Sequence, residues 1–309
     1  MAQTSFRKGV FFAFSAYFLW GILPIYWKLL SAIPSLHILG FRIIFSLFLV
    51  GTALFAMKNT SWLRFYKDRR KAFFLTMAAL TVTINWGFHI WAVNSGHTIQ
   101  TSLGYYITPL ISIVLGLCFF HEKLTILQTI AFGLAFTGVL ILTLLTGKLP
   151  WVSLVLAFSF GTYGLLKKTV QLTALESLGV ETLIASPLGI LLLLIPFGGG
   201  GSFPNFRGLS YFLELPIHTW FLLLLCGLVT SLPLFLFSKG AKLLPLSTLG
   251  FIQFVSPTLS FLTSLFIFKE PFSPSNFIAF GFIWTAAILY IISLWKMQDA
   301  RSSRGQGRK

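Results

Sequence analysis

Long apolar runs alternate with short polar breaks along the whole chain. Most runs are close to the length of about 20 residues that an α-helix needs to cross the hydrocarbon core of a bilayer. The pattern therefore predicts an all-α integral membrane protein with ten transmembrane helices. The predicted spans are residues 9–30, 36–57, 72–93, 98–120, 126–146, 151–166, 178–197, 219–238, 243–268 and 277–295.

One stretch of the chain occurs twice. The segment 109–142 aligns without a gap on the segment 257–290, and a shorter motif near the start of the chain recurs as Ala157-Phe158-Ser159. The repeat unit therefore contains five spans. The residues that anchor the alignment, for which we expect structural roles, are Pro109, paired with Pro257, and Glu122, paired with Glu270.

An odd number of spans per repeat fixes the relation between the two copies. The second copy must enter the membrane from the opposite side, so we predict a first repeat at 1–146, an inverted second repeat at 147–295 and a basic tail at 296–309. Two inverted halves of similar packing energy can exchange conformations. A central site then opens first to one side of the membrane and afterwards to the other.

Composition supports the membrane assignment and excludes other classes. Hydrophobic residues make up 56% of the chain and charged residues only 10%, with 23 Lys and Arg against 7 Asp and Glu. Soluble domains carry about a quarter charged residues, so a soluble enzyme and a disordered chain are excluded. The net charge of +16 does not indicate a nucleic-acid partner, because the basic residues are distributed between hydrophobic runs.

The basic residues predict the orientation. They concentrate in every second polar break and in the tail, and the residues assigned to these segments include Lys167 and Lys168. Only Lys148, Arg207 and Lys269 fall in the alternate breaks. Because basic loops stay in the cytoplasm, both termini are expected there, with the basic segments against anionic lipid headgroups.

Polar and aromatic side chains gather in the first, third, fourth, sixth and ninth spans. Polar groups at membrane depth usually face the bundle interior or a wet cavity. Walls of Trp and Tyr with a few amides suit a planar or cationic organic solute, through stacking and cation–π contacts. The candidate substrate-binding residues are Trp20, Asn85, Trp86, Trp91, Asn94, Tyr105, Tyr163 and Gln253.

The alternative for these aromatic residues is a belt at the membrane interface. We assign Trp27, Trp151, Trp220 and Trp295 to such a belt, because they lie near span ends.

Three ionisable residues within the spans are candidates for coupling or gating. Arg42 either pairs with a carboxylate, binds an anionic substrate group or extends outward to the interface. An unperturbed histidine titrates near physiological pH, so His89 suits a proton relay. Glu181 is either protonatable or hydrated at the cytoplasmic rim. For each of the three taken singly, a purely structural role is the preferred interpretation.

Several motifs of the chain closely resemble the RarD-type permeases, in the EamA group of the drug/metabolite transporter superfamily. The resemblance covers nearly the whole chain. It implies ten helices in two inverted EamA repeats, a bacterial inner-membrane location and secondary transport. The motifs that carry it include Asn85-Trp86, the segments 90–94 and 101–107, Tyr163-Gly164-Leu165, Glu181-Thr182-Leu183 and Leu249-Gly250-Phe251.

The resemblance does not fix the substrate, since superfamily members carry amino acids, nucleosides, drugs and S-adenosylmethionine. We take S-adenosylmethionine exchanged for S-adenosylhomocysteine as the concrete candidate, because an adenine ring and a sulfonium both suit an aromatic box. Amino acids and amphiphilic drugs such as chloramphenicol are the alternatives. A coupling proton or counter-substrate is a further expected partner, and the oligomeric state is left open.

Other classes of membrane protein fit less well. A membrane-embedded enzyme is disfavoured, because the two aspartates, Asp68 and Asp299, and the five histidines are scattered without metal-ligand spacing. We therefore expect no catalysis, no metal and no cofactor. The absence of a P-loop excludes an ATP-driven pump, and a channel would show neither saturation nor counterflow.

Overall fold

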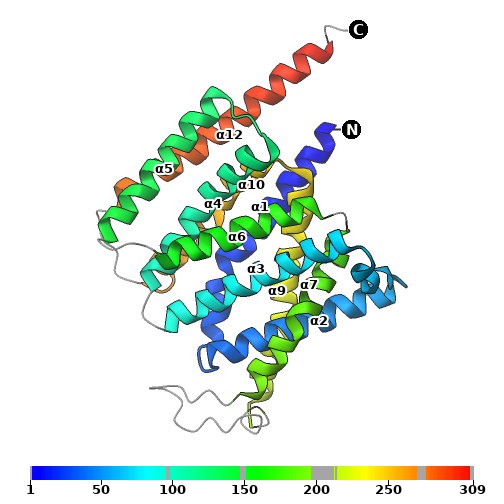
Figure 1. Ribbon diagram of the computed structural model, residues 1–309. Helices are drawn as coiled ribbons and strands as arrows, with labels where there is room; N and C mark the ends of the chain where they lie inside the picture. Colours follow the sequence, from blue (N-terminus) through cyan, green and yellow to red (C-terminus); the bar gives the residue numbers. More distant parts are fainter. Residues whose placement is uncertain are drawn as a thin grey trace.

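The computed structural model describes residues 2–94, 98–146, 151–170, 172–195, 212, 214–269 and 276–306. Within these ranges every regular element is a helix (Figure 1). The helices are α1 (Ala2–Leu29), α2 (Ser35–Ala56), η1 (Ser61–Lys67), α3 (Arg69–Asn94), α4 (Thr98–Phe120), α5 (Ile126–Thr146), α6 (Trp151–Thr169), α7 (Ala174–Leu194), α9 (Ile217–Leu243), α10 (Leu246–Gln253), α11 (Val255–Phe266) and α12 (Asn276–Gln306).

Each predicted span coincides with helix. Among the described residues, nine segments are long and apolar enough to cross a membrane, with α10 and α11 counted together. The tenth is α6, which carries Lys167 and Lys168 in its last turn. Two features extend beyond the prediction. The 3₁₀-helix η1 lies in the loop after α2 and buries Trp62, and α12 continues through most of the expected tail.

The ninth predicted span consists of two helices. α10 ends at Gln253 and α11 begins at Val255, with Phe254 between them. Pro257 lacks the amide hydrogen that would bond the carbonyl of Gln253 in a continuous helix. The carbonyl of Pro257 instead accepts a hydrogen bond from the Tyr106 hydroxyl on α4, at 3.1 Å.

The contacts between helices form a two-fold pattern. The contact of α1 with α9 corresponds to that of α6 with α3, and the contact of α2 with α9 corresponds to that of α7 with α3. In the same way, α1 packs on α10 and α11, and α6 packs on α4. The pairs α2 with α7, α4 with α10, and α5 with α12 join equivalent helices directly. Because each repeat contributes five spans, the paired contacts relate two inverted five-helix repeats.

The repeat extends to backbone geometry. His121 and Lys269 stand at equivalent positions of the aligned segments, directly after α4 and shortly after α11. Both adopt a positive φ, 50° and 54°. Non-glycine residues rarely enter this left-handed region, so the same turn at the same place supports the sequence alignment.

Side-chain contacts next to these turns repeat as well. The Nζ of Lys168, near the end of α6, lies 4.7 Å from the ring centroid of Phe120. The Nζ of Lys28, near the end of α1, lies 5.7 Å from the ring centroid of Phe268. Phe120 and Phe268 are partners in the sequence alignment. Lys28 and Lys168 therefore make equivalent contacts in the two repeats, although the short motif at 13–15 and 157–159 would align Lys28 with Leu172, about one helical turn away.

Small residues allow the helices to cross closely. A Cβ built on Gly250 of α10 would lie 2.7 Å from the carbonyl oxygen of Pro109 in α4. One on Gly138 of α5 would lie 2.7 Å from the carbonyl oxygen of Ala279 in α12. Close backbone contact of this kind is a common basis of helix association in membranes.

Both chain termini lie at the same end of the bundle (Figure 1). We call it the terminal end, where α1 begins at Ala2 and α12 ends at Gln306. The opposite end is where α2 begins at Ser35. Since consecutive spans alternate in direction, α4 also begins at the opposite end, whereas α7 begins at the terminal end.

Candidate functional site

Arg42 is the centre of a polar and aromatic group that joins four helices. It stands seven residues after the start of α2, roughly 10 Å along the helix from the opposite end. Its Cζ lies 4.8 Å from the ring centroid of Trp27 in α1 and 4.7 Å from that of Trp86 in α3. Its Nε donates to the Thr230 hydroxyl of α9, at 3.0 Å. Each cation–π contact stabilises the guanidinium by about 0.5–2 kcal/mol.

Two further candidates lie beside Arg42. The Tyr105 hydroxyl of α4 and the Nδ1 of His89 on α3 are 3.2 Å apart and form a hydrogen bond, and both side chains interact electrostatically with Arg42. Tyr105 nevertheless keeps 43% of its surface accessible, and Arg42 is only half-buried. We call Trp27, Arg42, Trp86, His89, Tyr105 and Thr230 the Arg42 group.

A second polar group lies nearer the terminal end. Glu181 stands seven residues after the start of α7. Its Oε1 accepts hydrogen bonds from Lys167 Nζ at 2.7 Å and from the Ser177 hydroxyl at 2.6 Å, and its Oε2 accepts one from the Tyr163 hydroxyl at 2.9 Å. All four side chains are buried. We call these residues the Glu181 group, a fully hydrogen-bonded ion pair inside the bundle.

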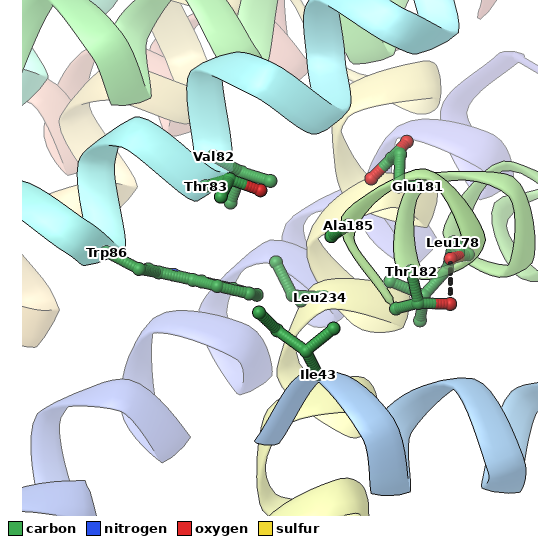
Figure 2. A pocket seen from close by; sticks show the side chains of 9 residues that line it. All are labelled: Ile43, Val82, Thr83, Trp86, Leu178, Glu181, Thr182, Ala185 and Leu234. Atoms are coloured by element: carbon green, nitrogen blue, oxygen red, sulfur yellow. Dashed lines mark hydrogen bonds between the residues drawn. The ribbon is translucent and has the colours of Figure 1, made fainter. Parts of the chain in front are cut away.

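A narrow pocket connects the two groups. Its enclosed space is small in the described conformation, with room for about one water molecule. Figure 2 shows the indole of Trp86 on one side of it and the side chains of α7, including Glu181, on the other. Trp86 therefore contacts Arg42 and lines the pocket that Glu181 also lines. The lining residues are Ile43, Val82, Thr83, Trp86, Leu178, Glu181, Thr182, Ala185 and Leu234.

Two candidate amides join the repeats to each other. Asn85 donates from Nδ2 to the carbonyl of Leu156 and to the hydroxyl of Ser159, both at 2.9 Å, and so joins α3 to α6. Gln253 accepts a hydrogen bond from the Ser112 hydroxyl at 3.3 Å and so joins α10 to α4. Both side chains are buried, and none of these hydrogen bonds involves Arg42.

The remaining aromatic candidates lie in two other places. Trp20 packs between Tyr17, Phe160 and Phe237 in an aromatic cluster that also contains Tyr163. Trp91 instead contacts Trp151, with ring centroids 5.6 Å apart, and Phe88. The side chain of Asn94 and all of Glu270 fall outside the described residues.

Glu122 caps the broken helix of the second repeat. Its carboxylate accepts hydrogen bonds from the backbone amides of Leu246 at 2.6 Å and Ser247 at 2.8 Å, the first residues of α10, and from Lys168 Nζ at 3.1 Å. Burial alone raises the pKa of Glu122, but the Ser247 and Leu246 hydrogen bonds and the charge of Lys168 outweigh it and hold that pKa below its usual range. Negative charge is favourable at a helix N-terminus.

Two residues of these groups were assigned differently from the sequence. Lys167 was counted with the cytoplasmic loops, which is wrong, because its ammonium is fully buried against Glu181. Its position four residues after Tyr163, on the same helix face, was the available signal. Trp27 was assigned to an interfacial belt, whereas its ring lies against Arg42.

Among the described residues, no three His, Cys, Asp or Glu side chains gather closely enough to hold a metal ion. The expectation that the protein needs no cofactor stays a prediction.

The family follows from comparison with known proteins. The model of the EamA-like transporter family matches residues 7–144 and again 149–292, once for each repeat. The chain belongs to the EamA-like transporter family. The resemblance to RarD-type permeases inferred from the motifs is thereby confirmed, and this EamA protein is a multi-pass membrane transporter.

Individual relatives agree with the family. The EamA protein is 40% identical to "Uncharacterized transporter YojE" of Bacillus subtilis (strain 168), over 98% of this chain and 100% of the relative. It is 38% identical to "Protein RarD" of Streptomyces exfoliatus, over 99% and 94%. One solved crystal structure is similar with a TM-score of 0.66 at 16% identity, over 91% of this chain and 96% of the other. That last likeness concerns the fold alone.

Proposed function

We propose that this EamA protein is a secondary transporter that moves a small organic metabolite across the bacterial cytoplasmic membrane by alternating access. The observation that carries the proposal is the paired helix contacts. α1 packs on α9 as α6 packs on α3, so two inverted halves of similar packing can exchange arrangements about a central site. The pocket between Trp86 and Glu181 lies where helices of both halves meet.

The proposed orientation places the terminal end in the cytoplasm, with both chain termini there. The concentration of basic residues in alternate breaks supports it. In the described conformation the Glu122 cap and the Glu181 group then close the cytoplasmic end, because both join α6 to neighbouring helices by ion pairs. The Arg42 group lies in the periplasmic half.

For the substrate we propose S-adenosylmethionine, exchanged for S-adenosylhomocysteine. The Arg42 group contains the rings of Trp27, Trp86 and Tyr105, which suit a solute with a planar part and so support this proposal. Amino acids and amphiphilic drugs such as chloramphenicol are the second candidates. His89 and Glu181 are the candidates for coupling to a proton, and a counter-substrate is the alternative driving partner.

Counterflow in proteoliposomes tests the proposal. The purified full chain is reconstituted with internal S-adenosylhomocysteine, and uptake of labelled S-adenosylmethionine is measured with and without a pH gradient. We expect saturable uptake that is faster with internal S-adenosylhomocysteine than with empty vesicles. Non-saturable flux without counterflow would indicate a channel and contradict the proposal. A response to the gradient alone would indicate proton coupling.

A matched pair of variants tests the site. We expect Trp86→Ala to reduce the uptake rate at least tenfold, because Trp86 contacts Arg42 and lines the pocket. Trp91→Ala should leave uptake within about twofold, because that ring packs on Trp151 and Phe88. The amount of each variant in the membrane is measured alongside. Equal effects of the two substitutions would contradict this assignment of the site.

A further inference from the structure

Arg42 and Glu181 occupy equivalent places in the two repeats. Each stands seven residues after the first residue of its helix, α2 or α7, and each follows a glycine, Gly40 or Gly179, by two positions. α2 and α7 are equivalent helices that pack on each other. The inverted repeat therefore places a cation near the opposite end and an anion near the terminal end, at corresponding depths.

The helices beside these two charges also correspond. Lys28 of α1 and Lys168 of α6 make equivalent contacts, because each lies over the phenylalanine that the repeat assigns to it. The residue directly before each lysine is Trp27 in α1 and Lys167 in α6. Trp27 and Lys167 are therefore the corresponding neighbours of Arg42 and Glu181.

Because Trp27 stands where the second repeat has Lys167, Arg42 and Glu181 have different partners. Lys167 lies 2.7 Å from Glu181 and neutralises it. Trp27 contacts Arg42 through its ring, and a ring does not supply the full negative charge that would neutralise a guanidinium. Within the part of the chain that the structure describes, no Asp or Glu forms an ion pair with Arg42, while the ion pairs found there join other residues.

The guanidinium also keeps capacity for further hydrogen bonds. Arg carries five N–H donors, and the bond to Thr230 uses only the one on Nε. A guanidinium at membrane depth is costly unless it is paired or hydrated. Arg42 is half-buried rather than sealed, so part of its surface stays accessible.

We propose that Arg42 binds a carboxylate of the transported solute, while Trp27 and Trp86 hold the apolar or aromatic part next to that carboxylate. This inference rests on the proposed transport function and narrows its substrate class to organic carboxylates. S-adenosylmethionine, S-adenosylhomocysteine and amino acids all carry a carboxylate, whereas chloramphenicol does not. Arginine suits this role because its planar group forms two parallel hydrogen bonds with a carboxylate.

A binding assay that does not depend on transport tests the inference. The full chain in detergent is titrated with phenylacetate and with phenylacetamide, which has nearly the same shape and no charge. Tryptophan fluorescence reports binding, because Trp27 and Trp86 adjoin Arg42. We expect phenylacetate to bind at millimolar concentration and at least tenfold more tightly than the amide.

Variants then assign the effect to one side chain. Arg42→Gln should reduce the affinity for phenylacetate at least tenfold, to that for the amide, and Arg42→Lys should keep part of the preference. The matched control is Arg70→Gln, since Arg70 also lies over a ring, that of Phe74 at 5.9 Å, but stands at the start of α3, at the terminal end. The Arg70→Gln variant should bind phenylacetate with the affinity of the unmodified chain.

Three results of the binding assay would overturn the inference. They are equal affinity for acid and amide, no response to phenylacetate at millimolar concentration, and unchanged binding in a folded Arg42→Gln variant. The melting temperature without ligand shows whether the Arg42→Gln variant folds. If it does not fold, the comparison of acid and amide on the unmodified chain decides the question. Counterflow of a solute without a carboxylate would contradict this inference and leave the transport proposal standing. Absence of counterflow would contradict the transport proposal, while the acid–amide comparison would still decide whether Arg42 binds a carboxylate.

Discussion

At the scale of single residues, the Lys167–Glu181 pair shows how a charge is kept inside the bundle. Both side chains are almost fully buried, and the glutamate also accepts hydrogen bonds from Ser177 and Tyr163. Desolvation opposes such a pair, so its net contribution to stability is small while both partners are present. Removal of one partner leaves the other charged and unpaired, which is strongly destabilising.

We therefore predict that Lys167→Met lowers the stability of the folded protein by about 3–5 kcal/mol. The double variant Lys167→Met, Glu181→Leu should recover a large part of the loss, because it removes both charges. Melting temperatures of the purified variants in one detergent measure both effects. The control is Lys71→Met, whose partner Asp68 is 3.5 Å away in an exposed pair. Its melting temperature should change far less, because exposed ion pairs contribute little to stability. Equal shifts for the two single variants would contradict the prediction.

The sequence revealed the charges but not their partners. Arg42 and Glu181 were identifiable because the sequence alone shows a charged residue within an apolar run. Lys167 was not, because its helix ends in two lysines and composition cannot show which of them turns inward. Trp27 was misassigned for the same reason, since a tryptophan near a span end can face either lipid or protein.

At the scale of helices, α5 and α12 approach each other through a glycine. A Cβ on Gly138 would lie 2.7 Å from the Ala279 carbonyl oxygen and 2.8 Å from the Ile283 side chain. The backbone oxygen cannot move without shifting α12. Gly133, on the same helix, has no atom within 4 Å of a built Cβ.

We predict that Gly138→Ala lowers the melting temperature and destabilises the protein by about 1–3 kcal/mol, as overpacking usually does. Gly133→Ala should be neutral or slightly stabilising, because alanine favours the helix and meets open space. Thermal unfolding of both variants in the same detergent compares them. A neutral Gly138→Ala would mean that α5 and α12 are less closely packed than described.

Helix positions were predictable because apolar runs set them, whereas the place of the break at Phe254 follows only from the structure. Pro109 and Pro257 are aligned by the repeat, yet only the second lies next to a break, since α4 is continuous. Glu122 also holds the first amides of α10, and tertiary contacts of this kind cannot be read from the sequence.

At the scale of the whole molecule, the alignment of the two repeats was enough to predict inversion. Five apolar runs per repeat determine the relative direction of the copies without any knowledge of contacts. The crossings themselves, such as α2 with α7, follow only from the structure. So does the closeness of Arg42 to Trp27 and Trp86, which lie on different helices far apart in the sequence.

The described conformation makes a prediction about access from the two sides of the membrane. Tyr105 is 43% exposed and stands seven residues into α4 from the opposite end. The Glu122 cap and the Glu181 group lie toward the terminal end. In a background with Cys118→Ser and Cys226→Ala, a membrane-impermeant maleimide should therefore label Tyr105→Cys from the periplasm of intact cells and much more slowly in inverted vesicles.

The matched control is Tyr66→Cys, in η1 at the terminal end, where Tyr66 is 64% exposed. It should be labelled in inverted vesicles and not in intact cells, which fixes the orientation independently. Labelling of Tyr66→Cys from the periplasm would mean that the proposed orientation is reversed. Equal labelling of Tyr105→Cys from both sides would mean that the terminal end is not closed. The reagent would then pass the ion pairs of α6 from the terminal end as readily as it reaches Tyr105 from the opposite end.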